Sequence, residues 1–378
     1  MDENYQICTR CVLDSSVKGI IFDDKGECNY CKIHDELEKF YPLNEEGERK
    51  RQLIIDDIKK KGRNGKYDCI LGVSGGTDST YCLYLLKKWG LRPLAVHFDN
   101  GWDSEIAVRN IKNATEKLDV DLYTYVMDWE EFKDLQISFL NASTPDGEIP
   151  TDIGIYGTLY KVAAREGVKY IVDGHSFRTE GTAPIFWTYM DGRYIAGVQK
   201  RFGTKKLRKF PNLRMGSLFY YSVVKGIKEF RPLEYVLYDK SAAGKFIENE
   251  LHWTYYGGHH HECIYTKFYH SYLFVKKFGI DYRRVSTSGR VRSGLTSRED
   301  ALKFFKDNPY ESEPDTVNYV ISKLGLSEKE FADIMALPPK TFLDYPTYYP
   351  IIKALRFPLK IATNLKLVPP ILLLKYGS

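Results

Sequence analysis

The sequence has no long hydrophobic run, since no stretch reaches the roughly 18 apolar residues that a membrane-spanning helix needs. The segment MDENYQICTRC also lacks the basic and then apolar pattern of a secretory signal. These absences predict a cytoplasmic protein, whose cysteines stay reduced, bind a metal or react rather than pair as disulfides. A strong charge of one sign is missing too: 55 Lys and Arg against 50 Asp and Glu leave a net charge of +5, which alone is no argument for nucleic-acid binding.

Length and composition place the chain among multidomain globular proteins. Its 378 residues correspond to two or three domains at about 150 residues each, and 43% apolar with 28% charged residues exclude a disordered chain. We predict four parts: a cysteine module at 1–42, a linker helix at 43–66, an α/β domain at 67–235, and a helical region at 236–378 for substrate or partner contacts.

The α/β domain is predicted from alternating patterns. Short apolar runs typical of strands lie at 68–73, 93–98, 121–126 and 169–172. Helical patterns lie between and around them at 79–89, 104–118, 129–140 and 153–166. This alternation predicts βαβ crossovers, and therefore an α/β fold with a mostly parallel sheet and helices on both faces.

Four of the seven cysteines stand in the first 31 residues, as two Cys-x-x-Cys pairs separated by 16 residues. The pairs are Cys8 with Cys11 and Cys28 with Cys31. They supply four thiolates, which is a ligand set for a tetrahedral Zn²⁺ site, and the glycines between them allow a ribbon hairpin. Because four cysteines leave no open coordination position, we expect structural zinc; a redox dithiol pair is the alternative.

A glycine-containing loop, SGGTDS, directly follows the first predicted strand and precedes a helix. At that position backbone amides and the helix N-terminus bind phosphate groups. The loop lacks the lysine of the GxxxxGKS motif and does not fit GxGxxG, which argues against a P-loop NTPase and a dinucleotide-binding motif. The predicted nucleotide-binding residues are Ser74, Gly75, Gly76, Thr77, Asp78 and Ser79.

Two further strand ends carry polar residues. His97 and Asp99 follow the second strand and are candidates for contact with the nucleoside, although Asp99 could simply form a turn. Gly174, His175 and Glu180 follow the fourth strand. Since the carboxyl ends of parallel strands share one sheet edge, these residues are expected beside the loop. Asp78 and Glu180 are the candidate Mg²⁺ ligands, and Asp78 is also a candidate catalytic residue.

Motifs for a fused nitrogen donor are missing. Position 2 is Asp, so no N-terminal nucleophilic cysteine follows Met1, and no GxCxG nucleophile elbow occurs. Nitrogen for an amide-activating reaction would therefore arrive as ammonia from a separate protein. Cys69 and Cys82 are expected to be core thiols, and Cys263 is a weak candidate for a sulfur carrier.

The region beyond residue 236 contains a second set of candidate residues. His261, Glu262 and Lys267 lie in the run GGHHHECIYTKF and are candidate catalytic residues, with a hydrogen-bonded helix start as the alternative. Arginine forks match diphosphate and carboxylate groups, so an arginine cluster predicts an anionic substrate such as a nucleotide sugar; a solvated basic face is the alternative. The cluster comprises Arg283, Arg284, Arg290 and Arg292.

The SGGTDS loop resembles the PP-loop of the ATP pyrophosphatases. Together with the cysteine pairs, the segment DGHSFRTEG at 173–181 and the run GGHHHECIYTKF, it makes the chain similar over nearly its whole length to the N-acetyl sugar amidotransferase family of the WbpG and PseA type. The resemblance implies a PP-loop ATP pyrophosphatase fold that uses ATP and Mg²⁺ and carries zinc on the cysteine pairs.

The same resemblance implies a reaction and partners. Such enzymes convert the acetamido group of a nucleotide-activated or related sugar to an acetamidino group, in the synthesis of lipopolysaccharide O-antigen or flagellar glycan. A HisH-like glutaminase makes the ammonia, and a HisF-like subunit delivers it. The alternative is a tRNA-thiolating PP-loop enzyme: the cysteine module and ten basic residues within 198–231 favour it. The lack of a cysteine pair in the α/β domain counts against it, so nucleic acid is not an expected partner.

Overall fold

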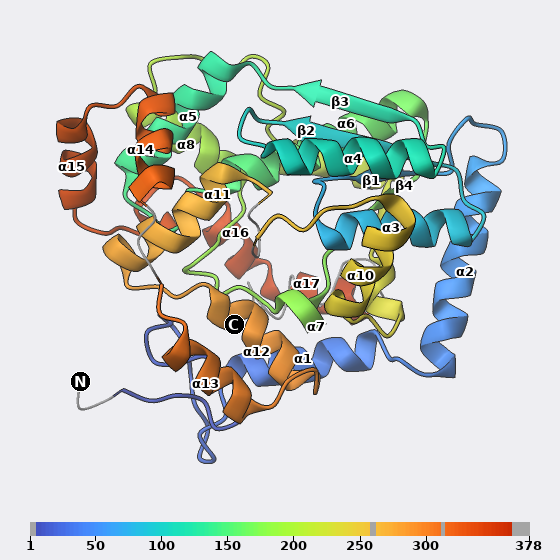
Figure 1. Ribbon diagram of the computed structural model, residues 1–378, viewed down its shortest axis with the longest axis horizontal. Coiled ribbons are helices and arrows are strands. Elements are labelled where there is room, and N and C mark those ends of the chain that lie inside the picture. The colour runs from blue at the N-terminus through green and yellow to red at the C-terminus, as the bar shows by residue number, and fades with distance from the viewer. Residues whose placement is uncertain (1–4, 258–261, 311–313, 365–378) are drawn as a thin grey trace.

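The computed structural model describes residues 5–257, 262–310 and 314–364 (Figure 1). Its described residues form a parallel five-stranded sheet with the strand order β3-β2-β1-β4-β5. The strands are β1 (Cys69–Gly72), β2 (Pro93–Asp99), β3 (Leu122–Val126), β4 (Tyr170–Val172) and β5 (Lys228–Phe230). The predicted parallel α/β sheet is therefore confirmed.

Four helices follow the strands in the predicted alternation: α3 (Thr77–Lys88), α4 (Glu105–Lys117), α5 (Trp129–Ala142) and α6 (Ile149–Glu166). The helix α6 begins four residues before the predicted start at 153. Proline is favourable in the first turn of a helix, where its missing N–H removes no intrahelical hydrogen bond, and Pro150 takes that place.

Helices cover both faces of the sheet. Alternate residues of each strand point to opposite faces, so each strand contributes to two cores. On one face Cys69 and Leu71 of β1 belong to a core that includes residues of α3. On the other face Ile70 packs in a separate core with Leu159 and Val162 of α6. Burial on both faces explains why the sequences of β1, β2 and β4 are continuous apolar runs rather than alternating patterns.

The sequence analysis missed β5. The strand has three residues, and only Phe230 is buried, while Lys228 and Glu229 are exposed. A strand this short and charged has no apolar run or alternation that marks it. It pairs with β4 through Tyr170–Lys228 and Val172–Phe230, so its position depends on tertiary structure.

Helices dominate both ends of the chain. The N-terminal helices are α1 (Asn29–Phe40) and α2 (Glu45–Gly62), and the latter lies within the predicted linker 43–66. Beyond β4 the α-helices of the described residues are α7 (Phe177–Glu180), α8 (Gly192–Phe202), α9 (Met215–Phe219), α10 (Lys240–Leu251), α11 (Ile264–Phe268), α12 (Arg283–Arg292), α13 (Arg298–Asp307), α14 (Pro314–Leu324), α15 (Glu328–Ala336), α16 (Tyr349–Ala354) and α17 (Arg356–Asn364). The π-helices are η1 (Tyr220–Val224) and η3 (Tyr269–Phe278), and the short 3₁₀ helices are η2 (Pro232–Tyr235) and η4 (Phe342–Asp344). Among the described residues, we find no helix with the length and apolarity to cross a membrane.

Packing crosses the boundaries between the four predicted parts. One large core includes Leu13 and Val17 of the cysteine module, Phe132 of α5 and Phe268 of α11. The domain limits therefore stay a prediction, and the sites described next are built from several parts of the chain.

Candidate active site and metal centre

The SGGTDS loop lies at the point where the strand order reverses. The chain moves from β1 outward to β2 and β3, then returns to β4 on the other side of β1. Ligands of open α/β sheets bind at the carboxyl ends of the strands flanking such a point. The loop after β1 and Gly174 after β4 meet here: a Cβ at Gly174 would lie 3.1 Å from the backbone N of Ser79.

The loop conformation requires glycine. Gly75 has a φ of +77°, and a Cβ there would lie only 2.3 Å from the carbonyl oxygen of Ala107. Ser74 Oγ accepts a hydrogen bond from the N–H of Gly76 at 3.3 Å and lies 3.4 Å from Ser79 Oγ. The helix α3 starts at Thr77, so its first N–H groups and these hydroxyls form an anion site.

A cavity of about 580 Å³ opens at this edge of the sheet, a volume in the range of small-molecule sites. Among the predicted nucleotide-binding residues, the cavity is lined by Ser74, Gly76, Asp78, Ser79, His97, Gly174, His175 and Glu180. Gly75, Thr77 and Asp99 are not among its lining residues. Asp99 accepts a hydrogen bond from the N–H of Gly101 at 2.9 Å, which is the turn role that the sequence left open.

Asp78 is the centre of a polar network that the sequence analysis did not foresee. Its Oδ2 lies 2.6 Å from Nζ of Lys240, and its Oδ1 accepts a hydrogen bond from the Tyr238 hydroxyl. Lys240 Nζ also lies 3.5 Å from Glu180 Oε1, and Glu180 Oε2 lies 3.0 Å from Nδ1 of His175. One ammonium group therefore bridges the two predicted magnesium ligands.

The network contains shifted protonation equilibria. Burial raises the pKa of Asp78 to about 6, against the opposing effect of Lys240. Burial would lower the pKa of Lys240, but the charges of Asp78 and Glu180 outweigh it and raise that pKa. Two carboxylates that reach one ammonium are also close enough to hold one Mg²⁺, which prefers oxygen ligands. Asp78 and Glu180 therefore fit the ion.

This geometry predicts a pH dependence of nucleotide binding. Since the pKa of Asp78 is raised to about 6, the carboxyl becomes protonated below that pH and loses its charge for a divalent cation. We expect the affinity for ATP with Mg²⁺ to be constant above pH 7 and to fall about tenfold per pH unit below pH 6, the slope of a one-proton equilibrium. Titration with a fluorescent ATP analogue between pH 5 and 8 measures this. An affinity that does not change down to pH 5 would contradict the assignment of Asp78 as a cation ligand. Asp78→Asn is the control, and its affinity should show no such fall below pH 6.

The cavity is rich in negative charge. Nine carboxylates line it among the described residues: Asp78, Asp103, Asp146, Glu148, Asp152, Asp173, Glu180, Glu234 and Glu262. The lysine and arginine side chains of its lining are Lys240 and Arg231. ATP is itself a polyanion, so this cavity requires cations to accept it.

Of the predicted catalytic residues, Asp78 and Glu262 line the cavity. A Cβ at Gly76 would lie 3.4 Å from Glu262 Oε1 and 3.2 Å from the Tyr256 hydroxyl, so both side chains lie over the loop. Lys267 is not among the lining residues, and His261 lies outside the described residues. The structure adds Lys240, Tyr238, Tyr256 and Arg231, which sequence reasoning missed.

The cysteines outside the N-terminal module are buried. Cys69 and Cys82 lie in the core beside the sheet, as expected. Cys263 lines the cavity, but burial raises the pKa of its thiol to about 12. The thiolate is the reactive form of cysteine, so the environment of Cys263 does not activate it as a sulfur carrier.

The arginines predicted to bind an anionic substrate lie elsewhere, and none is among the described residues lining the cavity. Arg283 pairs with Asp281 at 2.7 Å, and Arg284 donates to the carbonyl of Val12 at 2.6 Å. Arg290 is exposed on α12. The contacts of Arg283 and Arg284 are therefore within the protein rather than at the nucleotide loop.

The fourth arginine contacts the cluster of four N-terminal cysteines. The Nη2 of Arg292 lies 3.1 Å from Cys11 Sγ, and its Nε lies 3.4 Å from Cys31 Sγ. Four thiolates around a divalent ion carry a net charge of −2, so a buried guanidinium beside them offsets part of that charge. Arg292 is therefore a partner of the cysteine site rather than of a substrate.

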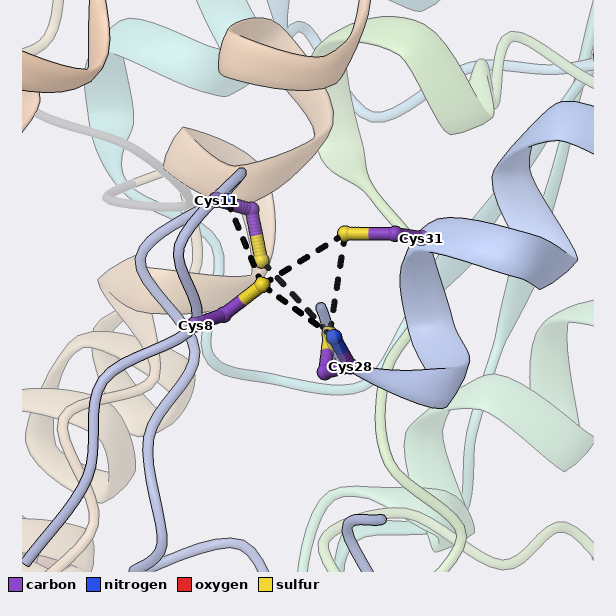
Figure 2. A group of neighbouring side chains, drawn as sticks. All are labelled: Cys8, Cys11, Cys28 and Cys31. Atoms are coloured by element: carbon purple, nitrogen blue, oxygen red, sulfur yellow. Dashed lines mark hydrogen bonds between the residues drawn. The ribbon is translucent and has the colours of Figure 1, made fainter. Parts of the chain in front are cut away.

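The four N-terminal cysteines converge as predicted (Figure 2). Their sulfur atoms all lie within 4.8 Å of one another, and neighbouring pairs are 3.7 Å apart. A tetrahedron with zinc–sulfur bonds of about 2.3 Å has sulfur atoms about 3.8 Å apart, so the spacing fits Zn²⁺. Backbone N–H groups of Arg10, Cys11 and Cys28 point at Cys8 Sγ, a further fit to a thiolate site.

Comparisons with known proteins agree with this architecture. Residues 262–356 match the family model described as "LPS biosynthesis protein WbpG-like, C-terminal domain", and residues 68–151 match that of "Queuosine biosynthesis protein QueC". An uncharacterized protein of Methanocaldococcus jannaschii is 30% identical over 309 residues, covering 78% of this chain and 91% of that protein. The tRNA(Ile)-lysidine synthase of Chlamydia pneumoniae is 36% identical over 84 residues, 21% of this chain and 24% of that enzyme.

Two solved structures match the chain with low TM-scores. The NH3-dependent NAD synthetase of Campylobacter jejuni, in complex with the nitrate ion, is 13% identical, with a TM-score of 0.32 over 82% of this chain and 98% of that chain. The NMN synthetase of Francisella tularensis is 13% identical, with a TM-score of 0.26 over 54% and 86%. The fold assignment rests on the strand order and the loop rather than on these low scores. With the two family models and the long relative, the loop and strand order show that the chain belongs to the WbpG-type family of PP-loop ATP pyrophosphatases.

Proposed function

We propose that the protein is an ATP-dependent N-acetyl sugar amidotransferase, which turns an acetamido group into an acetamidino group for a bacterial surface polysaccharide. The observation that carries the proposal is the cavity at the strand switch point. There the SGGTDS loop, which includes Asp78, meets Glu180 and Glu262 in a carboxylate-rich space. The match of residues 262–356 to a WbpG-like family model described by lipopolysaccharide biosynthesis supports the link to surface polysaccharide synthesis.

The chemistry solves a leaving-group problem. An amide oxygen cannot leave as oxide at neutral pH, so it must first become part of a better leaving group. The amide oxygen attacks the α-phosphorus of ATP, the bond from that phosphorus to the bridging oxygen breaks, and pyrophosphate leaves. Ammonia then adds to the imidate carbon, the carbon–oxygen bond to AMP breaks, and one proton passes to pyrophosphate. The products are an acetamidinium group, AMP and pyrophosphate.

Different residues of this chain have different roles in the proposed reaction. The first N–H groups of α3 and the hydroxyls of Ser74 and Ser79 bind phosphate oxygens. Lys240 supplies a positive charge beside Asp78, where charge on the leaving pyrophosphate would grow. Mg²⁺, when bound to Asp78 and Glu180, would offset phosphate charge. The carboxylates on the cavity wall suit a reaction whose product is a cation.

We propose that the ammonia comes from a HisH-like glutaminase through a HisF-like subunit, as in the family that the sequence resembles. The cytoplasm is the compartment that fits such an assembly and the use of ATP.

The products test the proposal. With ATP, Mg²⁺, an N-acetylated sugar nucleotide and ammonium chloride, we expect AMP and pyrophosphate in equal amounts, and a sugar whose mass shows oxygen replaced by NH. Glutamine in place of ammonium should give no product from the isolated chain. Phosphorus NMR and mass spectrometry measure both outcomes. Formation of ADP and phosphate, or equal use of glutamine, would contradict the proposal.

A further inference from the structure

We propose that the four-cysteine metal centre positions the nucleotide site, by clamping the short helix α7 between α1 and α12. The helix α7 is the element that presents Glu180 to Lys240 and His175. The inference rests on the proposed use of ATP in this cavity and goes beyond it, because it gives the metal a role in nucleotide affinity. Figure 1 shows α1, α7 and α12 close together, on the opposite side of the molecule from β3, and α12 contacts both other helices.

The first link joins the cysteines to α12. Arg292 at the end of this helix reaches the sulfur atoms of Cys11 and Cys31, and Ser288 Oγ accepts a hydrogen bond from the N–H of Val12 at 3.3 Å. The next helix adds Arg298, which donates to the carbonyl of Cys8 at 2.9 Å. The position of α12 is therefore tied to the geometry of the two cysteine loops.

The second link joins α12 to α7 through two glycines. A Cβ at Gly289 of α12 would lie 2.7 Å from the backbone N of Gly181 and 2.8 Å from the carbonyl oxygen of Phe177. A Cβ at Gly181 would lie 2.1 Å from the carbonyl oxygen of Val285. The two backbones touch without intervening side chains, so a shift of α12 moves α7 directly.

The third link joins the cysteines to α7 through α1, which begins immediately after Cys28. The His34 ring of α1 meets the Phe177 ring edge to face with centroids 5.0 Å apart. Arg178 of α7 donates to the carbonyl of Tyr41 at 2.6 Å, just past the end of α1. Tyr41 itself lines the cavity, so this link also forms part of the wall.

One contact of α7 is independent of the metal centre. Glu234 of η2 accepts hydrogen bonds from the N–H of Phe177 at 3.0 Å and the hydroxyl of Ser176 at 3.2 Å, which fixes the N-terminal end of α7. We therefore expect the clamp to fix the position of the C-terminal end of α7, where Glu180 and Gly181 lie. Losing the metal should weaken nucleotide binding rather than abolish the cavity.

Gly289→Ala tests the clamp without touching a thiolate. The added methyl group must push α7 and α12 apart, so we expect zinc content to stay at one per chain while the affinity for an ATP analogue falls at least tenfold. Gly216→Ala is the matched control, because a Cβ there meets nothing within 4 Å, and its zinc content and affinity should equal those of the wild type. An unchanged affinity in folded Gly289→Ala protein would overturn the inference.

Arg292→Met provides a second test, which does not depend on Gly289→Ala folding. The variant should lose zinc to a chromogenic chelator at least ten times faster than the wild type. Its affinity for the ATP analogue should fall as zinc is lost and return on addition of excess Zn²⁺. Affinity that stays constant while zinc leaves would overturn the inference. If wild-type protein with one zinc binds no ATP analogue at all, the proposed function fails instead, so the two failures are distinguishable.

Discussion

Asp78→Asn should reduce AMP formation by on the order of a thousandfold or more, with zinc content and folding unchanged. The substitution keeps the shape of the side chain and its place at the start of α3, but it removes the charge that pairs with Lys240 at 2.6 Å. It also removes one of the two carboxylates that fit Mg²⁺. Losing a single electrostatic contact to a developing charge typically costs 10²- to 10³-fold in rate, and Asp78 serves two such contacts. Quantifying AMP by chromatography measures the effect.

Asp99→Asn is the matched control for this experiment. Asp99 follows β2 at the same edge of the sheet, yet its carboxylate accepts a hydrogen bond from the N–H of Gly101, and an asparagine oxygen can accept the same bond. The control should keep activity within about twofold, since an intact turn leaves the cavity unchanged. Equal losses of AMP formation in both variants would mean that the substitutions disturb folding rather than a specific role of Asp78. Wild-type activity in Asp78→Asn would show that Asp78 has no role in the reaction.

Lys240→Met is expected to have the second largest effect. The ammonium group bridges Asp78 and Glu180, so its loss leaves two carboxylates facing each other without their cation. We expect a fall of about 10²- to 10³-fold in kcat, because the variant loses a positive charge beside the pyrophosphate. Since Lys240 lowers the pKa of Asp78, the acid limb of the pH profile should also move to higher pH in the variant.

The exposed Lys245 on the same helix provides the control for this second variant. Lys245→Met removes the same group from α10 without touching the cavity, and its rate and pH profile should match the wild type. A Lys240→Met variant with an unchanged acid limb would contradict the described network even if its rate fell. Steady-state rates between pH 5.5 and 9 decide between these outcomes.

Local patterns were sufficient to predict much of the fold and the nucleotide loop. Strands at the centre of a parallel sheet are buried on both faces, so their apolar runs stand out, as Ile70 and Leu71 in β1 illustrate. The loop is equally local, because its glycines follow the strand directly and Gly75 has the positive φ that favours glycine. The cysteine site was predicted because its four ligands lie in two short motifs of fixed spacing.

The missed features depend on contacts between distant parts of the chain. Lys240 reaches Asp78 across 162 residues, and no local pattern marks a lysine in the first turn of a helix as part of a nucleotide site. The sequence contains one indirect indication: because the phosphate-binding loop has no lysine, another part of the chain must supply a cation. The prediction of an anion site at the arginines of α12 failed because their partners are also distant in the sequence. The sequence shows the cluster of arginines, but Arg284 contacts Val12 and Arg292 contacts Cys11, each more than 270 residues away.

In the proposed reaction, the chain places AMP on an amide oxygen of the sugar. The most direct measurement uses an N-acetyl sugar substrate labelled with ¹⁸O in its amide carbonyl, with unlabelled ATP, Mg²⁺ and ammonium. The account predicts that the label is recovered in the phosphate group of AMP, seen as an isotope shift of the phosphorus NMR signal, and that pyrophosphate carries none. Label in inorganic phosphate or in water, or a product sugar that keeps its ¹⁸O, would contradict the account.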